Sequence, residues 1–352
     1  MSKQNWRKLI KITQVDTLLK LSANTPIIDV RSPSEFENGH IFGAINVPIF
    51  SDTEHKIIGT KYKQESRDTA LATALEIIAK KTDFFLNRIA KINSENIAVY
   101  CWRGGFRSDG MAHLFQSVGK NVFKLDGGYK SFRQHISQFF EQGFPFIILG
   151  GKTGSDKTKI LYELAKQDEQ VIDLEKLADH KGSAFGAIGE VPQKSLQQFE
   201  NNLFDALQKL TFKKRIWLED ESRMIGRLKI PDAIFRQIRS TNVINLEIPK
   251  KRRISNLMKN YTHFETVFLI DAVNRISRKL GGLNTKLIID AIEQNDFFTA
   301  IDIVLNYYDK TYQFGLSKRD LNTVFTLKIS TKTNQQIAEN LKIFVNNHDD
   351  EL

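Results

Sequence analysis

The single cysteine of this 352-residue chain, Cys101, lies in the stretch YCWRGGFRSDG of residues 100–110. An apolar, strand-like run at residues 96–100 leads directly into it, and helical spacing follows Arg107. A thiol between a strand and a helix can act as a nucleophile, because loop N–H groups and the positive helix end stabilise a thiolate or a bound anion. We therefore predict Cys101 to be the catalytic residue.

The residues after the cysteine form a candidate anion-binding loop. Glycine lets successive N–H groups point inward, and arginine adds a planar, two-pronged donor. The predicted members of the loop are Arg103, Gly104, Gly105, Arg107 and Ser108. This spacing fits a cysteine phosphatase, and it also fits a wide-looped sulfurtransferase whose cysteine carries sulfur or selenium. Tyr100 stands where the phosphatase pattern normally has histidine.

A second glycine-rich stretch, GGKTGSDKT at residues 150–158, follows the apolar run 145–149 and opens a helical pattern. It matches much of the P-loop template, whose lysine meets the outer phosphates and whose hydroxyl meets magnesium. The predicted phosphate-binding residues are Gly151, Thr153, Gly154, Ser155, Lys157 and Thr158. Asp156 replaces the second glycine, so we expect its carboxylate to repel phosphate and to crowd the backbone. An ordinary strand-to-helix turn is the alternative.

Two polar segments accompany this loop. DLEKLADHKGSAFG at residues 173–186 suits a polyanion, and WLEDES at 217–222 ends a strand in acids, as metal-binding strands of P-loop proteins do. The residues singled out are Asp173, Glu175, His180, Lys181, Ser183, Glu219, Asp220, Glu221 and Arg223. A decorated loop and a solvated strand end are the alternatives. The seven histidines show no metal-ligand spacing, so the sequence assigns no definite metal site.

Strand-like runs alternate with amphipathic stretches along most of the chain, which predicts parallel α/β sheets. From about residue 255 the pattern is mostly helical, and Gly143 and Pro145 punctuate the chain near the middle. We therefore predict two domains, residues 1–140 and 141–352. The second is expected to be a P-loop NTPase-like α/β domain with a helical C-terminal part.

Composition narrows the class of protein. A hydrophobic share of 41% supports buried cores, and one cysteine excludes an internal disulfide. Because no apolar run is long enough to span a membrane and no secretory signal is evident, we expect a cytoplasmic protein without membrane contact. The net charge of +10 is clumped at residues 212–215, 249–253 and 275–279. Such clumps favour a nucleic-acid partner, although a lysine-rich surface of no special purpose is the alternative.

Two segments resemble rhodanese signatures. DVRSPSEFENGHIFGAINVP at residues 29–48 is similar to the first signature of rhodanese domains, and LDGGYKSFR at 125–133 is similar to their closing segment. Residues 1 to about 140 thus resemble a rhodanese domain with a long catalytic loop. The resemblance implies an N-terminal rhodanese-like parallel sheet with flanking helices.

The cysteine loop joined to a P-loop resembles the bacterial tRNA 2-selenouridine synthase family, as do WLEDESRMIGRLKIP at 217–231 and LNYYDKTY at 305–312. The resemblance implies a transferase that exchanges sulfur for selenium in the 2-thiouridine at wobble position 34 of tRNA. It implies selenophosphate and geranyl diphosphate as substrates, an S-geranylated intermediate and no tightly bound cofactor, with magnesium allowed. The implied partners are the tRNAs for Lys, Glu and Gln and a selenophosphate-producing enzyme.

The chain departs from that family at several positions. Asp156 interrupts the P-loop, Lys181 replaces an arginine, and Glu65 replaces a glycine. The cysteine loop is intact, whereas the phosphate site is altered. Two alternatives therefore remain open: a degenerate tRNA-binding member with an impaired phosphate site, and a cysteine-dependent phosphatase.

Overall fold

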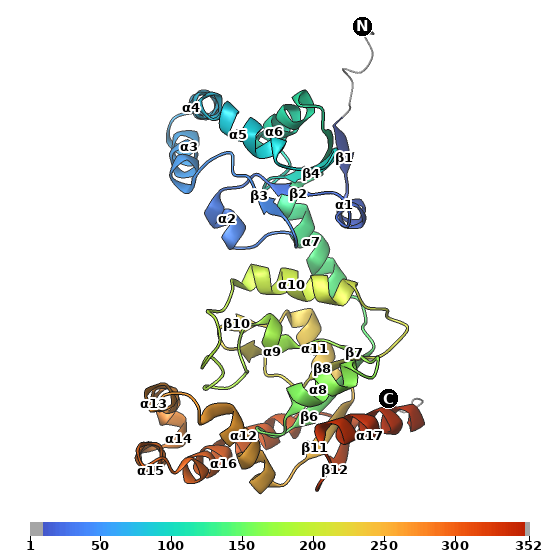
Figure 1. Ribbon diagram of the computed structural model, residues 1–352, viewed down its shortest axis with the longest axis vertical. Helices are drawn as coiled ribbons and strands as arrows, with labels where there is room; N and C mark the ends of the chain where they lie inside the picture. The colour runs from blue at the N-terminus through green and yellow to red at the C-terminus, as the bar shows by residue number, and fades with distance from the viewer. Residues whose placement is uncertain (1–9, 349–352) are drawn as a thin grey trace. The chain divides into compact units, whose positions relative to one another are not determined.

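The computed structural model describes residues 10–348 and divides into two compact units (Figure 1). The first unit extends to residue 139 and also includes residues 195–202, and the second comprises residues 140–194 and 203 onward. The sequence predicts two continuous domains, whereas in the structure residues 195–202 belong to the first unit although they follow residue 140 in the chain. They belong to it because Gln198 accepts a hydrogen bond from the backbone N–H of His40 at 2.8 Å, and Asn201 donates to the carbonyl of His40 at 2.9 Å.

The first unit contains a parallel five-stranded sheet in the order β1-β5-β4-β2-β3. Its strands are β1 (Lys11–Thr13), β2 (Ile27–Asp29), β3 (Ile45–Asn46), β4 (Asn96–Tyr100) and β5 (Asn121–Leu125). Its helices are α1 (Val15–Leu21), α2 (Pro33–Glu37), α3 (Asp52–Gln64), α4 (Arg67–Lys80), α5 (Thr82–Ala90), α6 (Phe106–Ser117) and α7 (Gly128–Phe140). Strand β4 is central, so its carboxyl end delivers Cys101 to the middle of the sheet edge.

The second unit contains another parallel five-stranded sheet, in the order β12-β11-β6-β8-β7. Its strands are β6 (Phe146–Gly151), β7 (Gln170–Val171), β8 (Ile216–Glu219), β11 (Val243–Glu247) and β12 (Val324–Lys328), and β9 (Met224–Ile225) and β10 (Leu228–Lys229) form a separate hairpin. The helices that follow α7 are α8 (Lys157–Ala165), α9 (Leu174–Leu177), α10 (Leu196–Gln208), α11 (Asp232–Ser240), α12 (Lys250–Tyr261), α13 (Thr266–Arg275), α14 (Ser277–Leu280), α15 (Gly282–Glu293), α16 (Phe297–Leu316), η1 (Leu321–Thr323) and α17 (Asn334–Asn347). The predicted α/β class is confirmed.

Each sheet is held by an apolar core between strands and helices. In the first unit, Val99 of β4 packs with Phe85 of α5 and Phe115 of α6, all of them buried. In the second unit, Trp217 of β8 and Leu341 of α17 belong to one buried cluster. Burial on this scale stabilises a domain by about 25 cal/mol for each Å² of apolar surface removed from water. The two cores fix the strand ends from which the candidate sites extend.

The C-terminal region is more helical than the rest of the chain, as predicted, but it also returns a strand to the sheet. Strand β12 pairs with β11 at the edge and is only half-buried along its length. An edge strand of this kind lacks the long apolar run that identifies a buried strand, which explains why the sequence did not predict it. Between residues 10 and 348, no helix combines the length and apolar character needed to cross a bilayer.

Candidate functional site

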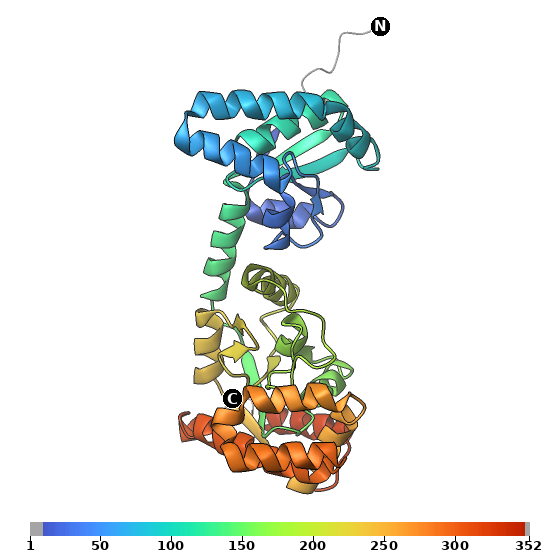
Figure 2. The same ribbon diagram turned by 90° about the vertical axis from the view of Figure 1, so that its left-hand side faces the viewer.

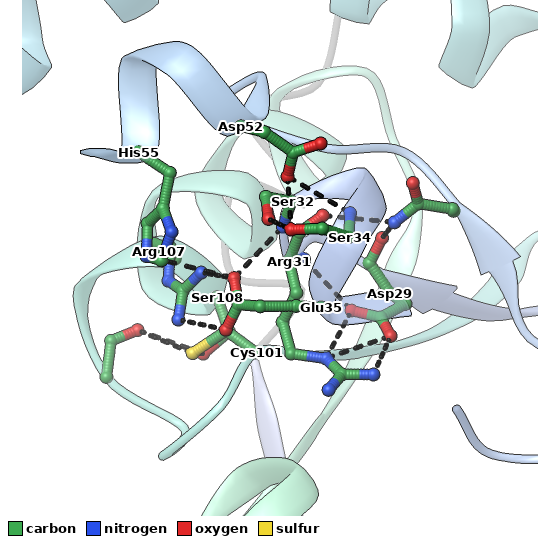
Figure 3. A network of polar contacts seen from close by, with 12 residues as sticks. Asp29, Arg31, Ser32, Ser34, Glu35, Asp52, His55, Cys101, Arg107 and Ser108 are labelled. Atoms are coloured by element: carbon green, nitrogen blue, oxygen red, sulfur yellow. Dashed lines mark hydrogen bonds and ion pairs between the residues drawn. The ribbon is translucent and has the colours of Figure 1, made fainter. Parts of the chain in front are cut away.

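The thiol of Cys101 lies at the base of the loop that joins β4 to α6 (Figure 3). The residue is only 3% exposed, and its Sγ lies 3.2 Å from Oγ of Ser108 and 3.8 Å from the carbonyl oxygen of Gly105. Ser108 in turn donates to the carbonyl of Gly105 at 2.9 Å. The predicted Cys101, Gly105 and Ser108 therefore meet in one place, with the serine hydroxyl oriented beside the sulfur.

The loop needs glycine at two points where backbones approach closely. Gly104 has φ of +68°, and a Cβ there would lie 2.9 Å from the carbonyl oxygen of Leu125. Gly128 has φ of +62°, and its Cβ would lie 2.3 Å from the carbonyl oxygen of Cys101. The backbone N–H of Tyr129 donates to that same carbonyl at 2.8 Å. Because glycine lacks a side chain, the segment 126–129 can pack directly against the backbone of the cysteine loop.

Arg107 is held by a carboxylate in this structure. It makes a two-pronged pair with Glu35, at 2.6 and 3.2 Å, and His55 Nε2 lies 3.8 Å from the same carboxylate (Figure 3). Burial opposes ionisation of Glu35, but the pair with Arg107 outweighs it and lowers the pKa of Glu35. Sequence reasoning expected Arg107 to close an anion ring around the thiol. An incoming anion would instead have to draw Arg107 away from Glu35. The side chain of the other predicted arginine, Arg103, is exposed to solvent.

The first rhodanese-like signature has a structural role. Arg31 is 1% exposed and pairs with Asp29 at 2.6 Å, donates to the carbonyl of Gly39 at 2.6 Å, and lies 3.9 Å above the Tyr129 ring. The hydroxyl of Tyr100 accepts a hydrogen bond from the N–H of Ile41 at 3.2 Å. Tyr100 is therefore a core residue, and burial raises the pKa of its hydroxyl well above the usual value.

The P-loop adopts a phosphate-cradling arrangement between β6 and α8. Lys157 reaches back so that its Nζ donates to the carbonyl of Gly151 at 3.1 Å. Thr158 donates to Glu219 at 2.6 Å, and Ser155 donates to the carbonyl of Lys152 at 2.6 Å. The N-terminal end of α8 and the lysine therefore point toward the same space, where an anionic phosphate would be stabilised.

Asp156 occupies a left-handed backbone position, with φ of +57°. The template has glycine there because glycine enters this region freely, while aspartate enters it at a cost of about 1 kcal/mol. Its Oδ1 lies 3.2 Å from Nζ of Lys159, and α8 begins directly at Lys157. The charge of Asp156 is partly balanced by Lys159.

Residues outside the predicted set brace this loop. Arg253 is 3% exposed, donates to the carbonyl of Thr153 at 3.0 Å and pairs with Asp309 at 2.7 and 2.8 Å. The hydroxyl of Tyr312 accepts from the N–H of Gly151 at 2.7 Å. Arg253 lies within a basic clump, and Tyr312 lies within LNYYDKTY. Both signals were visible, but nothing in the sequence indicated that they meet the P-loop.

The basic clump at residues 249–253 is largely engaged within the fold. Lys250 pairs with Asp302 at 2.6 Å, and Arg253 is buried against the P-loop. Arg215, in the clump at 212–215, pairs with Glu169 at 2.7 Å. The clump at 275–279 differs, because its cations are exposed, and one of them, Arg278, lines a hollow together with the exposed Lys286 of α15. This group, the α13–α15 basic surface, consists of Arg275, Arg278, Lys279 and Lys286.

Three predicted acids converge on the P-loop. The carboxylate oxygens of Glu175, Glu219 and Glu221 lie within 4.8 Å of one another. Burial, and then repulsion from Glu219, raises the pKa of Glu175 to about 8, and burial likewise raises the pKa values of Glu219 and Glu221. Lys157 lies among them, and their charges raise its pKa although its own burial opposes this. Such crowded carboxylates need protons or a cation nearby.

The other predicted polar residues have separate partners. Asp173 caps α9 and accepts from Tyr162, and Asp220 pairs with Arg319 at 2.6 Å. The remaining contacts are those of Arg223 with Asp232, Lys181 with Glu190, His180 Nδ1 with the N–H of Gly182, and Ser183 Oγ with the N–H of Phe185. Asp220 is thus a structural ion-pair partner. Glu175, Glu219 and Glu221 are the acids that can serve a ligand on the P-loop.

A cavity of about 770 Å³ opens beside the P-loop and the three glutamates. Its polar wall includes Lys157, Thr158 and Glu219, and its other wall is built by side chains of α13, α15 and α16. This volume lies within the range of about 300–1,000 Å³ typical of small-molecule sites. The second unit therefore contains a candidate ligand site that combines the predicted phosphate-binding groups with an apolar surface.

Comparison with known families agrees with this arrangement. A rhodanese-like domain model matches residues 14–135, and the model described as the tRNA 2-selenouridine synthase AAA domain matches residues 144–342. The chain is thus a rhodanese-like domain followed by a P-loop domain of the AAA type. It belongs to the tRNA 2-selenouridine synthase family.

Curated relatives support this assignment over nearly their whole length. The tRNA 2-selenouridine synthase of Nitrosomonas europaea is 30% identical, over 86% of this chain and 92% of the relative. That of Shewanella pealeana is 33% identical, over 85% of this chain and 91% of the relative. Among solved structures, the N-terminal domain of a putative ATP/GTP binding protein from Clostridium difficile 630 is 37% identical, covering 36% of this chain and 98% of that one, with a TM-score of 0.33.

Proposed function

We propose that this protein is an enzyme that replaces the sulfur of 2-thiouridine at wobble position 34 of tRNA with selenium from selenophosphate. The reaction passes through an S-geranylated intermediate made from geranyl diphosphate. The observation that supports it best is the buried Cys101 thiol with Ser108 3.2 Å away, in a chain whose relatives are named tRNA 2-selenouridine synthases. Its acceptors are the tRNAs for Lys, Glu and Gln, and the reaction takes place in the cytoplasm.

The first unit carries the selenium step. Cys101 carries or delivers selenium, and the N–H groups of its loop hold the phosphate-bearing donor, together with Arg103 and with Arg107 once the anion has drawn it away from Glu35. Sulfur bound to C2 is a poor leaving group as a bare thiolate, whereas its alkylated form leaves as a thiol. The selenium of selenophosphate then forms the new bond to C2 as the bond from C2 to the alkylated sulfur breaks and geranyl thiol leaves. Water hydrolyses the P–Se bond and releases phosphate, which leaves 2-selenouridine. A selenophosphate-producing enzyme supplies the donor.

The second unit carries the alkylation step. The P-loop residues Lys157 and Thr158 hold the diphosphate of geranyl diphosphate. The neighbouring acids fit a magnesium ion, because the hydroxyl of Thr158 and three carboxylates converge there. Thr158, Glu219 and Glu175 would hold it, and it would neutralise charge on the diphosphate. No other cofactor is required.

The α13–α15 basic surface binds the tRNA backbone. Arg278 and Lys286 also line a shallow hollow of about 460 Å³ on the same helices. Exposed cations of this kind neutralise phosphates without reading sequence, so acceptor choice is left to the modified base itself.

The test is nucleoside analysis of tRNA that contains 2-thiouridine, after incubation with the full chain. Selenophosphate and geranyl diphosphate together should yield 2-selenouridine, and geranyl diphosphate alone should yield only the S-geranylated nucleoside. Formation of neither product by the folded protein would overturn the proposal. A cysteine-dependent phosphatase would instead hydrolyse a simple aryl phosphate, and we expect no such turnover.

A further inference from the structure

The cavity beside the P-loop continues into a region that offers no phosphate-binding groups. Its wall there is formed by side chains from α13, α15 and α16, and α15 packs against both of the other helices (Figure 2). The residues that line it are Leu269, Ile288, Ile292, Phe297, Ala300 and Val304. All six side chains are apolar, and five of them are at most 9% exposed. This region is here called the apolar arm.

The loop of residues 181–189 joins the apolar arm to the phosphate site. The N–H of Ala184 donates to the hydroxyl of Tyr308 at 3.1 Å, and the Phe185 ring meets Tyr261 edge-on at 6.0 Å. Phe185, Tyr261 and Tyr308 all line the cavity. The loop therefore lies along a continuous surface from the P-loop to the apolar helices, and one ligand can touch both ends.

We propose that the apolar arm binds the hydrocarbon chain of an isoprenoid diphosphate, and that Ala300 and Val304 limit the length of chain accepted. The proposal rests on the proposed function for its head group, since the diphosphate would lie on the P-loop. A hydrocarbon chain matches the arm because it buries apolar surface and leaves no polar group without a partner. A ribose and base would bring polar groups against six side chains that can neither donate nor accept hydrogen bonds.

Ala300 and Val304 are suited to limiting the chain. They lie one turn apart on α16, and therefore on the same face of the helix, and they are 3% and 9% exposed. Both are small, and both line the cavity. A larger side chain at either position would project into the arm and shorten it, while the P-loop would be unaffected.

The experiment measures binding to the full chain without tRNA. Inorganic diphosphate, geranyl diphosphate, farnesyl diphosphate and ATP are titrated separately by calorimetry with magnesium present. Geranyl diphosphate should bind at least about 100-fold more tightly than inorganic diphosphate, because several apolar carbons leave water. Ala300→Phe and Val304→Phe should each weaken geranyl diphosphate by at least about tenfold and leave inorganic diphosphate unchanged.

Leu283→Phe is the matched control. Leu283 lies on α15 but is 74% exposed and does not line the cavity, so its enlargement should change neither affinity. If the enlarged variants fail to fold, Phe297→Ala replaces them, and it should bring farnesyl diphosphate closer in affinity to geranyl diphosphate. Equal binding of inorganic and geranyl diphosphate would overturn the proposal. So would tighter binding of ATP than of geranyl diphosphate, or folded Phe variants with unchanged affinity.

These results separate the apolar arm from the proposed function. Suppose that the protein binds geranyl diphosphate much more tightly than inorganic diphosphate but forms no 2-selenouridine. That result would support the proposal for the apolar arm and contradict the proposed function. If the protein forms 2-selenouridine but binds geranyl diphosphate no more tightly than inorganic diphosphate, only the proposal for the apolar arm would be contradicted.

Discussion

Cys101 combines a buried sulfur with a serine hydroxyl at 3.2 Å and a loop carbonyl at 3.8 Å. These contacts position the thiol at the base of the loop but leave the chemistry to sulfur, because a hydroxyl at the same place is a far weaker nucleophile. Cys101→Ser should therefore abolish 2-selenouridine formation and leave tRNA binding unchanged. Liquid chromatography of the digested tRNA measures the first and a filter-binding titration the second. Undiminished selenouridine in the variant would show that another group carries selenium.

Asp156 is the residue at which this chain departs most clearly from a P-loop. Asp156→Asn removes the charge and keeps a residue that tolerates the left-handed backbone, and Asp156→Gly removes both charge and strain. Both should raise affinity for inorganic diphosphate by about fivefold, since a carboxylate partly balanced by Lys159 costs about 1 kcal/mol beside an anion. Calorimetry on the two variants tests this. A loss of affinity in both would mean that Asp156 itself helps to bind the ligand.

Among the elements, the first residue of α7 lies so close to another backbone that it leaves no room for a side chain. Gly128→Ala places a methyl group 2.3 Å from the carbonyl oxygen of Cys101 at a positive φ, so we expect the free energy of unfolding to fall by about 2–4 kcal/mol. Gly110→Ala on α6 is the control, because its Cβ would meet nothing within 4 Å and alanine favours a helix. Urea denaturation followed by circular dichroism compares the two. Equal stability of both variants would contradict the close approach described here.

A pH-sensitive contact joins Glu169, which precedes β7, to Arg215 and Trp217 at the start of β8. Burial opposes ionisation of Glu169, but Arg215, which donates to it at 2.7 Å, and Trp217, at 2.9 Å, lower its pKa below the ordinary value of 4.5. A carboxylate whose pKa is lowered on folding stabilises the fold above its unfolded pKa and loses that contribution as pH falls through the folded pKa.

Glu169→Gln should therefore reduce stability near neutral pH by about 1.5–3 kcal/mol, the range for hydrogen bonds to a charged group. The difference from wild type should shrink steadily as the pH falls below about 4, where the wild-type carboxylate is also neutral. Urea midpoints measured across this pH range test the prediction. A difference that does not depend on pH would mean that packing, and not charge, explains the effect.

At the scale of the whole molecule, the net charge of +10 is the property that favours tRNA. The cations of the α13–α15 basic surface are exposed, whereas Lys250 and Arg253 are engaged within the fold. Affinity for tRNA should fall steeply with salt, and changing Arg275, Arg278 and Lys279 together to alanine should flatten that slope by about one to three units.

The matched control for that variant is the triple change of the exposed Lys56, Lys63 and Lys80, on α3 and α4, to alanine. These lysines lie on the first unit, so the control should keep a slope close to that of wild type. A control that flattens the slope as much as the test variant would show that the charge acts through the net total and not through this surface.

Much of the protein was evident from local patterns. Strands and helices are encoded in periods of two and 3.6 residues, so the parallel α/β class, the strand before Cys101 and the strand before the P-loop were all predicted correctly. The motifs also identified the family, because a cysteine loop and a glycine- and lysine-containing P-loop rarely occur together in one chain. Strand β12 was missed because an edge strand carries a weak apolar signal.

Only the tertiary structure decided which charged groups are free to bind a ligand. Arg107 and Arg253 both read as anion-binding cations, yet Glu35 holds the first and Asp309 the second. Their partners lie 72 and 56 positions away in the chain. Long side chains pair with whatever the fold brings within about 4 Å, and local sequence patterns do not specify those distant neighbours. The same reason explains why the apolar arm could not be predicted, since its wall is assembled from three helices that meet only after the chain has folded.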